Sequence, residues 1–316
     1  MAYLKTRPAW VQLFLFIGLA FGIFIVITLI GVLILSNMTG ISLYDLSDTG
    51  KWDYSNPAMI TFIRGMLVVQ FLGLFLIPSL LFGYFSDPQP LEYIGLNKPS
   101  KNVYYLLGAT ALIVALPLVD WLGVVNRQIQ FPQNIAGWMQ ESEEQAARQI
   151  EFMLSKHTLK DLLLNLLFIA VFAGVGEELF FRSVLQRLLI RICRSPLAGI
   201  LIAAFIFSAI HFQFYGFIPR FVLGILLGLI YWYSGSIWPA IIAHFVYDAF
   251  AVIMIYFNPA LLKNTDATIF SASVSGITAL ISFILVIALV WYMRKHSTVT
   301  YEKVYAVDKP ADPFSF

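Results

Sequence analysis

The chain has 316 residues, of which 59% are hydrophobic and only 12% are charged, and its formal net charge is +2. A soluble globular protein carries about 25% charged residues, so this composition, with a mean hydropathy of +0.81, excludes a single water-soluble core. The small net charge gives no reason to expect a nucleic acid as a partner. The sequence therefore predicts an integral membrane protein that has the lipid bilayer as its first partner.

Apolar runs of about 20 residues, the length that crosses a bilayer as a helix, recur along the chain. They are continuous rather than alternating, which favours helices over the strands of a membrane barrel. The predicted fold is an all-α, polytopic membrane helix bundle that forms a single domain over residues 1–316. We expect about eight transmembrane helices, over residues 11–36, 58–84, 103–125, 162–181, 197–211, 218–233, 237–257 and 270–293.

Basic residues collect beside one set of span ends, and cytoplasmic segments of membrane proteins are enriched in Lys and Arg. With eight spans, all of these residues fall on the same side. We therefore expect a multi-pass protein of the cell membrane with both termini in the cytoplasm. The residues are Lys5, Arg7, Lys98, Lys101, Arg187, Arg191, Arg194, Arg294 and Lys295.

Two segments outside the spans are long enough to form structure of their own. Residues 126–161 mix apolar and charged positions, which predicts an outer interfacial segment with one or two amphipathic helices, or else a solvated linker. Residues 296–316 form an expected cytoplasmic tail without recognisable chemistry.

The most informative polar residues are two adjacent glutamates and an arginine inside the apolar run 172–192. Ionisable groups at membrane depth are costly and therefore indicate function. Glu178 and Arg182 are four residues apart and can pair on one helix face, whereas Glu177 is rotated by about 100° from Glu178. Glu177 is thus left with an unmatched carboxyl group, which suits a general base. A purely structural ion pair at a helix end is the alternative.

Two later spans add histidines. His211 ends the sequence Phe207-Ser-Ala-Ile-His211, and His244 begins His244-Phe-Val-Tyr-Asp248, with Asp248 on the same helix face. A single buried histidine is more often a packing residue than a catalyst. Three helices that carry Glu, His and His-Asp can instead converge on one site, so we take residues 162–257 as the catalytic core.

The ordered motifs Glu177-Glu178-x-x-x-Arg182, Phe207-x-x-x-His211 and His244-x-x-x-Asp248 resemble those of the CPBP intramembrane proteases. This family includes the type II CAAX prenyl endopeptidases and bacterial bacteriocin-processing or immunity proteins. The resemblance covers about residues 162–257. It implies a glutamate-dependent endopeptidase with no required metal or cofactor, acting near the cytoplasmic face on a peptide or lipidated protein substrate.

The resemblance also implies a role for each motif residue. Glu177 would activate a water molecule together with His211, and His244 and Asp248 would stabilise the oxyanion. Glu178 and Arg182, with Phe207 of the second motif, would support the site rather than attack. Amide hydrolysis needs both an activated water and donors where negative charge develops.

Asp248 departs from the family pattern, because the prenyl endopeptidases that this chain resembles have Asn at that position. An ionised Asp accepts hydrogen bonds and cannot donate one. Asp248 is therefore expected either to be protonated or to act indirectly, by holding His244 as a donor.

Three other functions stay open from the sequence. Glu177, His211, His244 and Asp248 are all possible zinc ligands, so a zinc-dependent membrane protease could use the same residues. A membrane transporter could use them as a proton or cation path. A catalytically silent immunity or scaffold protein would retain them without turnover. The sequence leaves the substrate and the oligomeric state undetermined.

Overall fold

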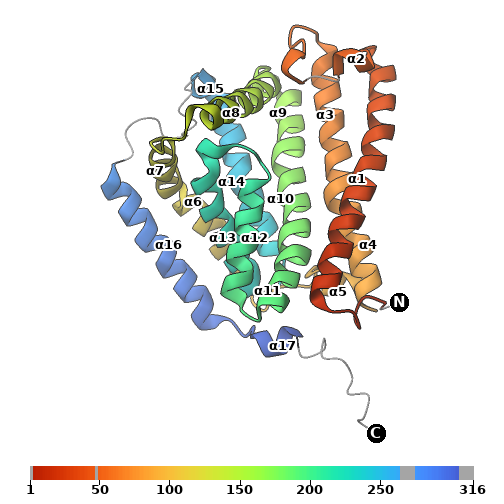
Figure 1. The fold of residues 1–316 in the computed structure, drawn as a ribbon. Helices are drawn as coiled ribbons and strands as arrows, with labels where there is room; N and C mark the ends of the chain where they lie inside the picture. Colours follow the sequence, from red (N-terminus) through yellow and green to blue (C-terminus); the bar gives the residue numbers. More distant parts are fainter. Residues whose placement is uncertain (1–2, 47–48, 264–274, 306–316) are drawn as a thin grey trace.

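The computed structural model describes residues 3–46, 49–263 and 275–305, and every regular element within them is a helix. Residues 270–274 of the last predicted span and residues 306–316 of the predicted tail lie outside the described residues. The long helices stand side by side in one bundle (Figure 1). The predicted all-α, polytopic membrane fold is confirmed.

The N-terminal part consists of two long antiparallel helical rods. The first is α1, whose outward face exposes large apolar side chains such as Phe14, Phe21 and Leu29, as expected for a surface in lipid. The second runs without interruption through a π-helical stretch, η2. The elements are α1 (Ala9–Thr39), α2 (Leu43–Leu46), η1 (Thr49–Lys51), α3 (Ala58–Gln70), η2 (Phe71–Leu76), α4 (Ile77–Ser86) and α5 (Pro90–Tyr93).

The remaining elements surround the segment that carries the motifs. One apolar helix of 35 residues, Leu159–Cys193, contains two π-helical stretches, η3 and η4. The elements are α6 (Val103–Val114), α7 (Leu116–Arg127), α8 (Gln133–Leu154), α9 (Leu159–Asn165), η3 (Leu166–Val171), α10 (Phe172–Glu177), η4 (Glu178–Gln186), α11 (Arg187–Cys193), α12 (Pro196–Ala209), η5 (Phe214–Gly216), α13 (Phe217–Ser234), α14 (Trp238–Phe257), α15 (Ala260–Lys263), α16 (Gly276–His296) and α17 (Tyr301–Tyr305).

The number of spans differs from the eight expected. In the described residues six helices are long and apolar enough to cross a membrane, or seven if α6 and α7 count as one bent span. These two are bent by 40° next to Pro117, which has no N–H to continue the helix. The expected span 197–211 is α12, whose 14 residues reach only about 21 Å at 1.5 Å per residue, too short for the hydrocarbon core.

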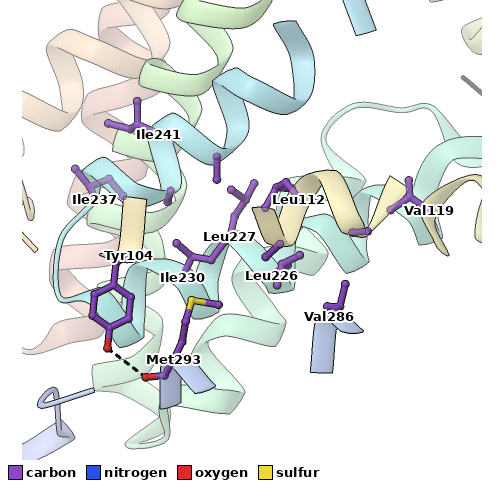
Figure 2. Close-up of a cluster of buried hydrophobic side chains, with 14 residues drawn as sticks. Tyr104, Leu112, Val119, Leu226, Leu227, Ile230, Ile237, Ile241, Val286 and Met293 are labelled. Carbon is purple, nitrogen blue, oxygen red and sulfur yellow. Dashed lines mark hydrogen bonds between the residues drawn. The ribbon is translucent and has the colours of Figure 1, made fainter. Parts of the chain in front are cut away.

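A buried apolar cluster fixes α14 against α6, α7, α13 and α16 (Figure 2). Close approach between α6 and α14 depends on Gly108, where a Cβ atom would lie 3.0 Å from the Pro239 carbonyl oxygen. Tyr104 Oη, near the N-terminal end of α6, donates a hydrogen bond to the Met293 carbonyl oxygen at 3.2 Å. Small residues that let backbones approach, with polar bonds between helices, are the usual means of association in lipid.

The beginning of α1 and the end of α16 lie at one end of the bundle (Figure 1). There Lys5 pairs with Asp87 at 3.4 Å, and the Tyr305 hydroxyl of α17 donates to the Arg187 carbonyl oxygen at 2.8 Å. The first described part of the tail thus packs on the bundle.

The opposite end is crossed by α8, which forms most of the expected interfacial segment 126–161 (Figure 1). One helix of 22 residues is present there. Its Trp138 ring packs against Phe212 and Phe214, with ring centroids 6.3 and 5.2 Å apart. These contacts join α8 to the loop that follows α12, close to His211.

Candidate active site

The first motif lies in the 35-residue helix Leu159–Cys193, called the long helix below, where α-helical winding changes to π-helical winding. Glu177 is the last residue of α10, and Glu178 is the first residue of η4. π-helical turns inside α-helices occur frequently at functional sites. The helix is positioned by Gly174, because a Cβ atom there would lie 3.2 Å from the Phe245 backbone nitrogen and 3.3 Å from the Ile241 carbonyl oxygen of α14.

Glu178 and Arg182 form the predicted ion pair. Arg182 Nη1 lies 2.9 Å from Glu178 Oε1, and both side chains are almost completely buried, with 2% and 0% of their surface exposed. Arg182 Nη2 also donates to the Gly224 carbonyl oxygen of α13, at 3.4 Å. The pair is therefore sealed inside the protein and ties the long helix to α13.

His244 links the ion pair to the rest of the site. Its Nδ1 lies 2.9 Å from Glu178 Oε1, and its Nε2 lies 3.4 Å from Asp248 Oδ2 and 4.0 Å from Glu177 Oε2. A carboxylate oxygen accepts hydrogen bonds, so Nδ1 donates to Glu178. Both ring nitrogens of His244 thus face carboxylate oxygens, an arrangement that an imidazolium ring satisfies. The contact between His244 and Glu178 does not follow from motif spacing.

His211 is oriented by its own helix. Its Nδ1 lies 2.7 Å from the Phe207 carbonyl oxygen, which can only accept, so Nδ1 carries a proton and donates it. In the neutral ring Nε2 is then an acceptor, and it lies 4.0 Å from Glu177 Oε1. Since 4.0 Å is too long for a direct hydrogen bond, these two acceptors are spaced to share a water molecule between them.

Phe207 fills the space between the charged groups. Its ring lies under the Arg182 guanidinium, at 4.4 Å from Cζ to the ring centroid. The same ring contacts the imidazoles of His211 and His244, with centroids 5.1 and 6.4 Å apart. A cation above an aromatic face is attracted by the ring quadrupole. Phe207 thus holds three of the predicted residues in place.

The three predicted motifs therefore come together at one place. Exposure divides their side chains into two groups. Glu177, His211 and Asp248 keep 15%, 27% and 23% of their side-chain surface exposed, whereas Glu178 and Arg182 are sealed. The partly exposed group is the one that a substrate or water molecule can reach.

A protein metal site needs at least three side-chain ligands arranged around one point. Within the described part of the chain, no group of three or more His, Cys, Asp and Glu side chains is arranged to hold a metal ion. The carboxylates contact the histidines instead, at the distances given above.

Three further residues position the site and were not expected from the motifs. Gly174 permits the close packing of the long helix on α14. Asn126 at the end of α7 holds the segment after His211: its Nδ2 donates to the Phe214 carbonyl oxygen at 2.6 Å, and its Oδ1 accepts from the Ile218 backbone nitrogen at 2.9 Å. Arg220 of α13 lies in the same region and acts electrostatically on Glu177 and His211.

The segment that carries all three motifs can be compared with known proteins. Residues 159–250 match the family model described as type II CAAX prenyl endopeptidase Rce1-like. The segment that carries the motifs is therefore similar to this family. All seven predicted site residues, from Glu177 to Asp248, lie inside the matched range.

A curated protein is also similar to part of the chain. The uncharacterized protein YpbD of Bacillus subtilis strain 168 is 31% identical over 98 residues, which are 30% of this chain and 47% of YpbD. The match spans about half the length of that curated relative. No solved structure matches the chain.

Proposed function

We propose that the protein is an intramembrane endopeptidase in which Glu177 and His211 activate a water molecule. The observation that carries this proposal is the pair of acceptors, Glu177 Oε1 and His211 Nε2, 4.0 Å apart on partly exposed side chains. A water molecule that donates one hydrogen bond to each would be held with its oxygen lone pair free to attack a carbonyl carbon.

The reaction that follows from this arrangement is a direct hydrolysis. The water oxygen bonds to the scissile carbonyl carbon while its proton passes to Glu177. The carbonyl oxygen becomes an oxyanion, and the C–N bond then breaks as the proton is delivered to the leaving nitrogen. No covalent intermediate with the enzyme is needed, because the nucleophile is water.

His244 is the proposed donor to the oxyanion. Its Nδ1 is engaged by Glu178, so the Nε2 proton points towards the region between Glu177 and Asp248. Asp248 accepts from Nε2 in the resting site and would keep the ring protonated. Asp248 thus acts through His244. This indirect role is compatible with an aspartate at a position where the resemblance implies Asn, a residue that can donate a hydrogen bond to the oxyanion.

The proposed substrates are membrane-associated or prenylated, CAAX-type peptides. The support is the family described as type II CAAX prenyl endopeptidase Rce1-like and a site carried by apolar helices. Cleavage near the cytoplasmic face of the cell membrane remains the expectation from the distribution of basic residues.

The test is hydrolysis of a fluorogenic library of CAAX-type and membrane-tethered peptides by the purified protein in detergent. Glu177→Gln and His211→Ala should each reduce kcat by at least about 100-fold, the usual contribution of a positioned acid or base. Glu141→Gln changes an exposed carboxylate on α8 and serves as the matched control. Full activity in both site variants would refute the mechanism. Loss of wild-type activity with a chelator, restored by zinc, would favour the metal-dependent alternative.

A further inference from the structure

Arg220 is a cation inside a membrane-spanning segment that the three motifs leave without a role. It lies in the first turn of α13, within the candidate span Phe214–Ser234, and is partly buried. Its guanidinium donates to Gln213, from Nη2 to Oε1 at 2.7 Å and from Nη1 to the carbonyl oxygen at 3.4 Å. Among the described residues, no carboxylate lies within ion-pair distance of it.

This placement is unfavourable for a cation in two ways. A charge at membrane depth is costly unless it is paired, and the N-terminus of a helix carries the positive end of the helix dipole. Gln213 offers only neutral acceptors. A guanidinium at a helix N-terminus favours an anion as its ligand.

The guanidinium is held in position by its surroundings. A Cβ atom at Gly216 would lie 3.2 Å from Arg220 Nη2, so a side chain there would require the guanidinium to shift by a few tenths of an ångström. The segment that leads into α13 is fixed by the two hydrogen bonds of Asn126. The position of the positive charge is therefore set by the fold and not by a flexible side chain alone.

The charges around Arg220 connect it with the proposed catalytic groups. Its electrostatic neighbours are Glu143 of α8, Glu177 of α10 and Tyr247 of α14. It also interacts electrostatically with His211. Burial raises the pKa of the Glu143 carboxyl, while Arg220 lowers it. Since the effect of burial is the larger one, Glu143 is a poor permanent counter-ion for Arg220.

We propose that Arg220 binds the C-terminal carboxylate of the peptide substrate. The planar guanidinium matches a carboxylate with paired hydrogen bonds, and its field reaches the groups that would cleave the chain nearby. Arg220 would select peptides that end close to the scissile bond and set their register against Glu177. This inference rests on the proposed endopeptidase function.

The experiment compares two forms of one peptide that the wild-type protein cleaves: a free C-terminal acid and the corresponding amide. The wild type should cleave the acid with a kcat/KM higher by about 10- to 100-fold, the usual range for hydrogen bonds to a charged group, mainly through a lower KM. In Arg220→Gln the ratio should fall towards one, and in Arg220→Lys it should be intermediate. Arg148→Gln, an exposed arginine of α8, should keep the wild-type ratio.

The outcomes separate this inference from the proposed function. If the wild type cleaves acid and amide equally well, Arg220 does not bind the C-terminal carboxylate of the substrate, although the protein is still a peptidase. If the wild type cleaves neither, the proposed function fails first. A binding measurement in Glu177→Gln, with the same peptide pair, gives a second test: the acid should bind more tightly than the amide. Equal affinity there would also overturn the inference. If Arg220→Gln does not fold, the ratio of kcat/KM for acid over amide is compared between Arg220→Lys and the wild type instead.

Discussion

Glu178 and His244 are joined across two helices by a buried contact of 2.9 Å between Oε1 and Nδ1. The same carboxylate oxygen lies 2.9 Å from Arg182 Nη1. One buried anion thus neutralises a guanidinium on its own helix and orients an imidazole on α14. The long helix and α14 are coupled through this oxygen, so the geometry at His244 depends on Glu178.

Removing that carboxylate should affect both folding and activity. In Glu178→Ala, Arg182 and His244 would remain buried without their shared counter-charge, which costs about 3–5 kcal/mol for a broken buried pair. We expect a large fall in the thermal unfolding midpoint in detergent and no measurable hydrolysis. In Glu144→Gln, the exposed pair of Glu144 with Arg148, 3.6 Å apart, is lost, and the change should be below about 1 kcal/mol. Equal stability of the two variants would contradict the coupling.

Asp248 should tolerate replacement by Asn. Its Oδ2 lies 3.4 Å from His244 Nε2, and the Asn carbonyl oxygen can accept the same hydrogen bond while its amide donates towards the oxyanion. We expect kcat/KM of Asp248→Asn to stay within about tenfold of wild type, whereas Asp248→Ala should lose about 100-fold or more, as for one oxyanion-hole group. Steady-state rates of both variants on one peptide check this. If Asp248→Asn lost as much activity as Asp248→Ala, the negative charge of the carboxylate would be required, contrary to this prediction.

The all-α membrane fold was predicted from the sequence alone because it depends on local patterns. The seven motif residues lie close together in the structure, and their roles stay a prediction. Helix periodicity was enough to pair Glu178 with Arg182, since partners four residues apart need no knowledge of other helices. The contact between Glu178 and His244 was missed, because it depends on how closely the long helix approaches α14 at Gly174. The helical periodicity of the sequence does not contain the distance between two helices.

Arg220 was also missed, although a signal was present. It is a lone cation inside an apolar run, and the rule that pointed to Glu177 applies equally to it. It stands outside the three motifs, which carry all of the predicted site residues. The number of candidate spans is six or seven in the described residues rather than about eight. The difference arises partly at the apolar run 197–211, because α12 ends at Ala209 and is followed by η5.

Gly174 should not accept a side chain. In Gly174→Ala the new Cβ atom would meet only backbone atoms of α14, at 3.2 to 3.4 Å, and backbone cannot rotate away. The two helices would have to separate by a few tenths of an ångström, which should cost about 1–3 kcal/mol as overpacking and lower kcat by moving His244 from Glu178. Thermal unfolding and peptide hydrolysis measure the two effects.

Gly22 of α1 supplies the control for this substitution. A Cβ atom at Gly22 would have nothing within 4 Å, and replacing a helical glycine by alanine is favourable by about 0.5–1 kcal/mol when space allows. Gly22→Ala should therefore be neutral or slightly stabilising with full activity. The opposite signs of the two variants are the expected result, and a stabilised, fully active Gly174→Ala would disprove the close-approach argument.

Asn126 should be required for activity although it touches none of the motif residues. One of its hydrogen bonds goes to the carbonyl oxygen of Phe214, the first residue of η5, and the other to the N–H of Ile218, just after η5. Asn126→Ala therefore leaves a carbonyl oxygen and an N–H without partners, at about 1–3 kcal/mol for each buried group. The segment from His211 to Arg220 would lose its fixed position. We expect reduced kcat and, if Arg220 reads the carboxylate, a reduced preference for the free-acid peptide.

Asn97 provides a matched comparison at the other end of the bundle. Its Nδ2 also reaches backbone oxygens, of Lys98 at 3.2 Å and Gly235 at 3.1 Å, but it is exposed, and water can replace it. Asn97→Ala should keep both the wild-type kcat and the preference for the free acid. If the two Asn variants lose activity to the same extent, general destabilisation explains the loss. A selective loss in Asn126→Ala would instead mean that the fixed segment between His211 and Arg220 is part of the working site.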